Sequence, residues 1–182
     1  MKKTVLTFGA ISGCIISLMM LTTTLFQDDI GFDRGEVIGY TSMVLAFLLV
    51  FFGVRSYRDN VAGGTIRFGR AFAVGALISV VASLCYVATW EVIYFKLAPD
   101  FGDKYRTHLL EKARQDGESD EAIARRKAQL DQFVQLYRNP AINAAITFLE
   151  PLPVSMVVSL IAAGVLSRKK DRGVLTTPRP TL

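Results

Sequence analysis

The chain has 182 residues, of which 51% are hydrophobic and 20% charged, and its mean hydropathy is +0.35. A soluble domain of this length seldom has so apolar a composition, which argues against a soluble globular protein. The net charge of +5 would suit nucleic-acid binding, but the basic residues lie beside apolar segments, so no nucleic-acid partner is predicted.

Four apolar stretches are long enough to cross a membrane, which takes about 20 residues of α-helix for roughly 30 Å of hydrocarbon. They are residues 4–26, 37–54, 71–95 and 141–166. The first two carry no charge, the third carries only Glu91 and the fourth only Glu150. Backbone groups in lipid must be satisfied within the segment, and the stretches do not alternate as barrel strands do. We predict an all-α, polytopic four-helix transmembrane bundle over residues 1–170.

The first stretch also has features of a cleaved leader. Lys2 and Lys3 precede an apolar run, as in signal peptides, and residues 11–14 (Ile-Ser-Gly-Cys) resemble a lipoprotein cleavage motif. The apolar run continues past Cys14 through residues 15–21, where a lipoprotein would turn polar. We therefore expect this helix to be retained, with cleavage before Cys14 as the alternative.

Small residues recur every four positions in three of the stretches, a spacing that lets helices approach closely in lipid. The residues expected to pack are Gly9, Gly13 and Ser17 in the first, Gly75 and Ser79 in the third, and Ser155 and Ser159 in the fourth. Packing within the bundle is favoured over homodimerisation, although the sequence does not decide the oligomeric state. The second stretch is bulky all round, and we expect it to face lipid.

Basic residues beside the helix ends gather on one side of a four-span topology. They are Lys2, Lys3, Arg55, Arg58, Arg67, Arg70, Arg168, Lys169, Lys170 and Arg172. The opposite short loop has four acidic residues and only Arg34. The positive-inside rule then predicts cytoplasmic N- and C-termini in a bacterial inner membrane, and the basic residues should attract anionic lipid head groups.

Residues 97–139 form the one substantial predicted segment outside the membrane. Apolar residues at helical spacing in each half, separated by Gly117, predict a helical hairpin. Its apolar stripes could pack on each other, on the mouth of the bundle or on the lipid surface, and the hairpin could contact an envelope protein. Ser119 and Asn139 are expected N-caps, and residues 171–182 are expected to be a disordered cytoplasmic tail.

Two intramembrane carboxylates, Glu91 and Glu150, are the strongest candidates for a polar site, because charges inside the bilayer usually face a protein interior or a cavity. Other polar or aromatic residues near them complete the candidate site, namely Asn143, Thr147, Trp90 and Tyr94. One interpretation is an outward-opening vestibule that relays protons or binds a cation. The other is structural: Glu91 sits in the aromatic belt, and Glu150 bonds to backbone groups freed by neighbouring prolines.

Pro151 and Pro153 interrupt the fourth stretch, and each removes a backbone donor, so a helix kink is predicted there. His108 is the chain's single histidine and has no cysteine nearby, so no metal site is predicted. No catalytic triad, metalloprotease motif or nucleotide loop occurs. We therefore predict no catalytic residue, no cofactor and no enzymatic activity.

Several motifs together resemble a known family. They are Tyr57-Arg58-Asp59-Asn60, residues 63–68 (Gly-Gly-Thr-Ile-Arg-Phe), residues 71–75 (Ala-Phe-Ala-Val-Gly), residues 90–94 (Trp-Glu-Val-Ile-Tyr), residues 98–101 (Ala-Pro-Asp-Phe) and residues 147–153 (Thr-Phe-Leu-Glu-Pro-Leu-Pro). Their order is similar to that in the bacterial membrane family catalogued as domain of unknown function 4199, up to about Arg168. The resemblance implies a four-helix inner-membrane protein with a helical insertion before the last span, and it supplies no activity.

The leading functional hypothesis is a non-enzymatic membrane scaffold or envelope-interaction protein. The alternative is a small transporter or proton-coupled carrier that uses Glu91 and Glu150.

Overall fold

The computed structural model describes residues 1–167, and within them every regular element is a helix. The elements are α1 (Lys2–Leu25), α2 (Gln27–Ile30), α3 (Phe32–Asn60), α4 (Phe68–Val92), the π-helical turn η1 (Ile93–Leu97), α5 (Phe101–Gln115), α6 (Asp120–Tyr137), α7 (Pro140–Leu149) and α8 (Leu152–Leu166). The predicted all-α class is confirmed. The expected disordered tail, residues 171–182, lies outside the described residues.

Four helices are long and apolar enough to cross a membrane: Lys2–Leu25, Phe32–Asn60, Phe68–Leu97 and Pro140–Leu166. This confirms the predicted four-helix, multi-pass class. Each predicted stretch falls on one of these helices. The one exception is Phe26, the last residue of the first stretch, which lies just beyond α1. α3 continues well past residues 37–54 at both ends because a helix does not have to stop where the hydrocarbon does.

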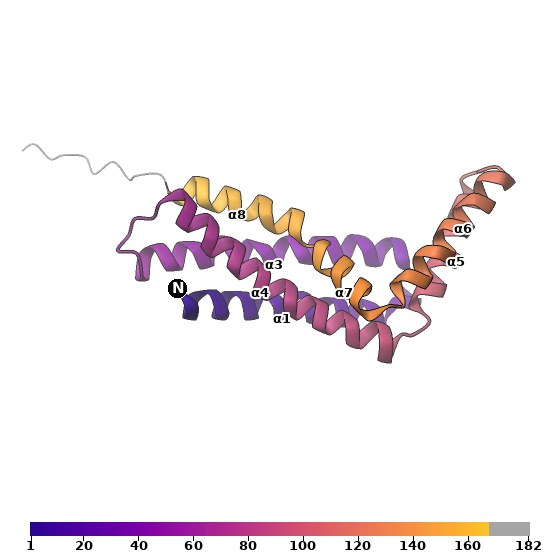
Figure 1. Cartoon of the computed structure of the whole chain (residues 1–182), viewed down its shortest axis with the longest axis horizontal. Helices are drawn as coiled ribbons and strands as arrows, with labels where there is room; N and C mark the ends of the chain where they lie inside the picture. The colour runs from indigo at the N-terminus through magenta and orange to yellow at the C-terminus, as the bar shows by residue number, and fades with distance from the viewer. Residues whose placement is uncertain (168–182) are drawn as a thin grey trace, which may run out of the picture.

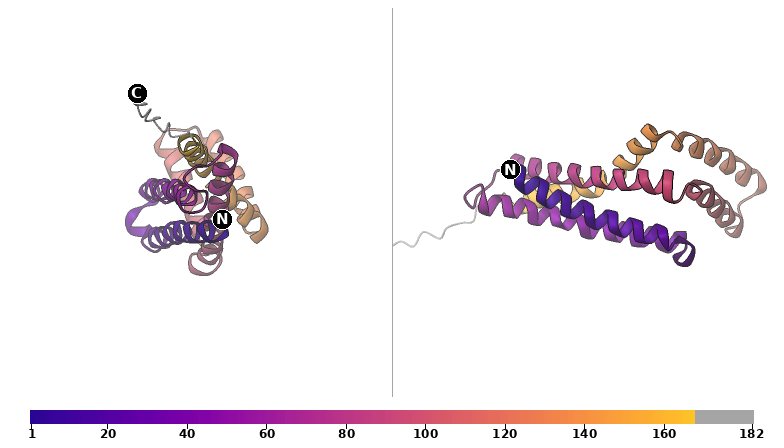
Figure 2. Two further views of the ribbon diagram at one scale, coloured as in Figure 1. Left: turned by 90° about the vertical axis from the view of Figure 1, so that its left-hand side faces the viewer. Right: turned by 90° about the horizontal axis from the view of Figure 1, so that it is seen from below.

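The spanning helices run side by side, and the α5–α6 hairpin projects from one end of the bundle (Figures 1 and 2). The N-terminus and the α3–α4 turn lie at the other end. α4 packs against α1, α3, α7 and α8, while α3 packs against α1 and α8 as well. α4 is therefore the central helix, and it reaches from the basic α3–α4 turn to the base of the hairpin.

α3 supplies much of the core, which corrects the expectation that this bulky helix faces lipid. Met43, Ala46, Phe47, Val50 and Val54 are each at most 3% exposed. The opposite face is exposed. Small residues on α1, α4 and α8 bring backbones together but fill little volume, so large side chains from α3 have to occupy the space between them.

Small residues lie where the helices are closest. A Cβ built on Gly9 would come within 2.6 Å of Val81 Cβ. A Cβ built on Gly13 would come within 2.6 Å of Cys85 Cβ. Further along, Gly75 faces Ser159.

The serines of the expected packing set are placed beside these contacts. Ser17 donates a hydrogen bond to the Cys85 carbonyl at 3.4 Å, across the α1–α4 interface. Ser79 and Ser155 are buried and bond to carbonyls of their own helices, those of Gly75 and Leu152. The structure thus brings the small residues of α1 and α8 against α4 within one chain.

Replacing Gly9 or Gly13 with alanine should force α1 away from α4 and lower the free energy of unfolding by about 1–3 kcal/mol. Gly164→Ala is the matched control: it also lies inside a helix, but a Cβ there meets no atom within 4 Å. That variant should be neutral or up to about 1 kcal/mol more stable. Reversible unfolding in mixed micelles measures the difference, and equal stability of Gly9→Ala and Gly164→Ala would contradict the α1–α4 packing.

Candidate functional site

The last span is interrupted between α7, which ends at Leu149, and α8, which begins at Leu152. Pro151 and Pro153 have no N–H to donate, so the helix loses two backbone hydrogen bonds within one turn at this point. Glu150 occupies the break as the C-cap of α7, and Pro151 is fully buried behind it. The break is what allows a carboxylate in this span to be directed toward the neighbouring helices.

Glu150 pairs with a side chain of α4. The Tyr86 hydroxyl donates a hydrogen bond to Glu150 Oε2 at 3.0 Å. The structural interpretation of the sequence had expected Glu150 to bond to backbone groups freed by the prolines. The structure corrects this, because the nearest suitable donor is a tyrosine across the α4–α7 interface.

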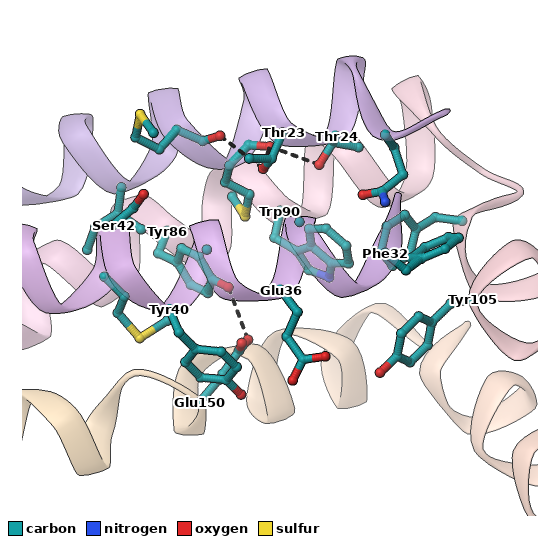
Figure 3. Close-up of a pocket in the computed structure, with 18 of the residues that line it drawn as sticks. Thr23, Thr24, Phe32, Glu36, Tyr40, Ser42, Tyr86, Trp90, Tyr105 and Glu150 are labelled. Atoms are coloured by element: carbon teal, nitrogen blue, oxygen red, sulfur yellow. Dashed lines mark hydrogen bonds between the residues drawn. The ribbon is translucent and has the colours of Figure 1, made fainter. Parts of the chain in front are cut away.

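A cavity of about 290 Å³ lies beside this pair, between α1, α3 and α4 and below the hairpin (Figure 3). Tyr86, Trp90 and Glu150 line it. α3 contributes Glu36 and Tyr40. The cavity therefore holds two carboxylates from different helices, and none of its lining residues is Lys, Arg or His.

Glu91 does not share this cavity. It follows Tyr86 by five residues, which places it about 140° around α4 on ideal helical geometry. Its Oε1 atom is buried and has no hydrogen-bond partner in the part of the chain that the structure describes. The structure thus separates Glu91 from Glu150, and the second carboxylate beside Glu150 is Glu36.

The remaining polar residues of the predicted site form a hydrogen-bonded chain. Trp90 Nε1 donates to Tyr137 Oη at 3.0 Å, and Tyr137 Oη lies 2.9 Å from Thr147 Oγ1. Thr147 donates to Asn143 Oδ1 at 3.3 Å, so its own hydroxyl must accept from Tyr137. Asn143 Nδ2 closes the chain on the Tyr137 carbonyl at 3.1 Å.

This chain is structural, because the Trp90 N–H and both hydroxyl groups in it have partners. Asn143 and Thr147 are at most 1% exposed, and unpaired polar groups at such positions would be costly. Burial raises the pKa of Tyr137, so its hydroxyl keeps the proton that the chain requires. Tyr94 joins the same cluster, with its ring 5.2 Å from that of Tyr137 and 5.8 Å from that of Trp90. Together these contacts tie α4, α6 and α7 to one another.

Aromatic rings attach the hairpin to the start of α3. The Phe32 ring lies 5.7 Å from that of Phe101, 5.5 Å from that of Tyr105 and 5.1 Å from that of His108. Trp90 extends the cluster, with its ring 5.1 Å from that of Phe101. The base of α5 therefore packs on the mouth of the bundle.

Ion pairs join the same surfaces. Asp33 lies 2.8 Å from Lys112 and 3.3 Å from His108, and Lys104 reaches Asp28 at 3.6 Å. The hydrogen bond that Lys112 donates to Asp33 raises the pKa of Lys112. Exposed pairs of this kind are screened by solvent and contribute little to stability, so the aromatic cluster supplies most of the attachment.

Two of the three expected hairpin contacts occur together. α5 and α6 pack on each other, where Leu110, Ala113 and Val134 are buried. Phe101 and Tyr105 of α5 also contact aromatic rings at the bundle mouth. The two expected helix starts are confirmed: Ser119 accepts from the Ala122 N–H, and Asn139 accepts from the Ala141 and Ile142 N–H groups.

Sequence reasoning missed three residues of this region: Glu36, Tyr40 and Tyr137. Glu36 was counted only as an acidic loop residue because it directly precedes an apolar stretch. Its spacing of four from Tyr40 places both on one face of α3 and was an available signal. Tyr137 lies outside the spans, and nothing local indicates that it reaches into them.

These features define a multi-pass, all-α membrane protein with an open acidic and aromatic cavity beside a helical hairpin. The chain belongs to the family described as Protein of unknown function (DUF4199), whose model matches residues 7–168. This confirms the predicted family. No curated protein and no solved structure matched the chain.

Removing the Tyr137 hydroxyl should break the chain at its centre. Tyr137→Phe leaves the Trp90 N–H without an acceptor and the Thr147 hydroxyl oxygen without a donor, which should lower the free energy of unfolding by about 1–3 kcal/mol. The control is Tyr105→Phe, whose hydroxyl makes no hydrogen bond within the described residues. Unfolding followed by Trp90 fluorescence compares the two variants, and equal stability would show that the Trp90–Asn143 chain does not form.

Proposed function

We propose that this protein is a non-enzymatic membrane scaffold that holds the α5–α6 hairpin in a fixed position for contact with another protein of the cell envelope. The observation that carries the proposal is the double attachment of the hairpin. At one end it is fixed through Phe32 and Asp33 of α3, and at the other through Tyr137 to α4 and α7. A hairpin held at both ends presents a defined surface.

The charge distribution supports an orientation for this scaffold. Arg55, Arg58, Arg67 and Arg70 surround the α3–α4 turn, which lies at the opposite end of the bundle from the hairpin. By the positive-inside rule that end is cytoplasmic, so both termini face the cytoplasm of a bacterial inner membrane and the hairpin faces outward. The same arginines are placed to contact anionic lipid head groups.

The hairpin itself offers a candidate contact surface on α6. Many of its charges are neutralised internally, as in the Arg106–Asp131 pair at 2.8 Å and the Arg126–Glu118 pair. Phe133 and Leu136 remain 46% and 56% exposed, three residues apart on one helix. Exposed apolar side chains framed by polar residues are a usual feature of protein contact sites.

The carrier hypothesis is the second candidate, and the cavity is the observation that favours it. Broken helices with a polar group at the break are typical of transporter binding sites. The separation of Glu91 from Glu150 removes the original residue pair, so a carrier would have to use Glu36 and Glu150. In a bundle of only four spans, such a site is better suited to holding a ligand than to moving one across the membrane.

Site-directed crosslinking in intact cells tests the scaffold. Single cysteines replace Phe133 or Leu136 in a background without Cys14 and Cys85, and a membrane-impermeant thiol crosslinker is added from outside. We expect a protein adduct of constant mass from both α6 positions. Glu111→Cys is the matched control, because it is exposed on α5 and lies outside the proposed contact surface. It should give little of the protein adduct.

Thr65→Cys, in the exposed α3–α4 turn, is the control for orientation and should react only after the cells are permeabilised. Reaction of Thr65→Cys in intact cells would refute the orientation. An α6 cysteine that reacts with the reagent but yields no adduct beyond that of Glu111→Cys would refute the contact surface.

A further inference from the structure

The scaffold leaves the cavity beside Glu150 without a role, although the structure keeps it open. Gly39 of α3 lines it, and a Cβ built there would meet no atom within 4 Å. The volume of about 290 Å³ is at the lower end of the range for small-molecule sites. Gly39 therefore borders open space, and a large side chain at this position would enter the cavity.

The charges in the cavity favour a cation. Glu36 and Glu150 both line it, and no basic side chain does. Glu150 is held by Tyr86 through Oε2, and its Oε1 makes no hydrogen bond within the described residues. Glu36 has no ion pair in the same part of the chain. Both carboxylates are therefore free to accept from a positively charged ligand.

The rest of the lining indicates what kind of cation fits. Figure 3 shows Tyr40, Tyr86, Trp90, Phe32 and Tyr105 arranged along the cavity with the two carboxylates. Aromatic faces attract ammonium groups and also contact their alkyl substituents. A metal such as Ca²⁺ takes six to eight oxygen ligands, and residues 1–167 contain no group of three or more His, Cys, Asp or Glu that could hold one.

We propose that this cavity binds a small organic ammonium ion between Glu36 and Glu150, with Tyr86 orienting the Glu150 carboxylate and the aromatic rings enclosing the alkyl groups. The ligand is either a free amine or the ammonium head group of a lipid, since both present the same charged group to a cavity that reaches the hairpin end of the bundle. The proposal concerns binding and does not depend on the hairpin having a protein partner.

Intrinsic fluorescence provides a direct test, because Trp90 is the only tryptophan of the chain and lines the cavity. The full chain in maltoside micelles is titrated with choline at constant ionic strength. In parallel it is titrated with 3,3-dimethylbutan-1-ol, which has nearly the same shape as choline but no charge. We expect a saturable change with choline and none, or a much weaker one, with the alcohol. A titration with dihexanoylphosphatidylcholine distinguishes the source, because a response to this lipid alone would assign the site to a head group.

Three variants locate the site. Glu150→Gln and Glu36→Gln should each weaken choline binding about tenfold, since each removes one charged acceptor. Gly39→Leu should abolish binding by filling the cavity while leaving both carboxylates in place. Glu91→Gln is the matched control, because it removes an intramembrane carboxylate outside the cavity and should bind like the native chain. Circular dichroism and gel filtration verify that each variant is folded. Glu36 is exposed, so Glu36→Gln should fold and report on binding even if Glu150→Gln fails to fold.

Equal responses to choline and the uncharged alcohol would overturn the proposal, because the cavity would then be only apolar. Unchanged affinity in both Glu36→Gln and Gly39→Leu would overturn it as well. The absence of any saturable response to choline and to the short-chain lipid would have the same meaning.

Discussion

The break in the last span is the feature on which the rest of this structure depends. A helix in lipid has to satisfy its own backbone hydrogen bonds, and two prolines one residue apart prevent that over one turn. The chain responds by ending α7 at Leu149 and starting α8 at Leu152, with Glu150 between them. Two contacts stabilise the break: Pro151 is fully buried, and Tyr86 supplies a partner for the carboxylate.

The break also determines how the hairpin meets the bundle. The chain passes from α6 into the start of α7, and α7 inclines away from the line of α8 (Figure 1). This places Tyr137 within reach of both Trp90 and Thr147, so that a residue outside the spans completes a buried hydrogen-bonded chain. On the other side, Phe32 and Asp33 hold α5. The hairpin and the cavity below it are thus parts of one arrangement, because Phe101, Tyr105 and Tyr137 belong to both.

The sequence was sufficient for the fold class, since apolar length and backbone satisfaction leave helices as the solution. It also predicted the N-caps at Ser119 and Asn139 and the interruption at Pro151, because those depend on local chemistry. The site was harder. Glu150 and Trp90 were predicted and do line the cavity, but Glu36, Tyr40 and Tyr137 come from other helices, and pairing across helices depends on their relative rotation. The lipid-facing expectation for α3 failed for the same reason: a uniformly bulky sequence does not indicate which face is buried.

Spin-label distance measurement between the hairpin and the bundle tests this account most directly. Labels at Gln115→Cys, on the end of α5, and Asp29→Cys, in α2, report whether the hairpin keeps one position; both sites are exposed, and the background lacks Cys14 and Cys85. The account predicts a single narrow distance distribution in lipid nanodiscs that broadens when Tyr137→Phe and Asp33→Asn are introduced together. A broad or multiple distribution in the chain with both attachments intact would contradict it.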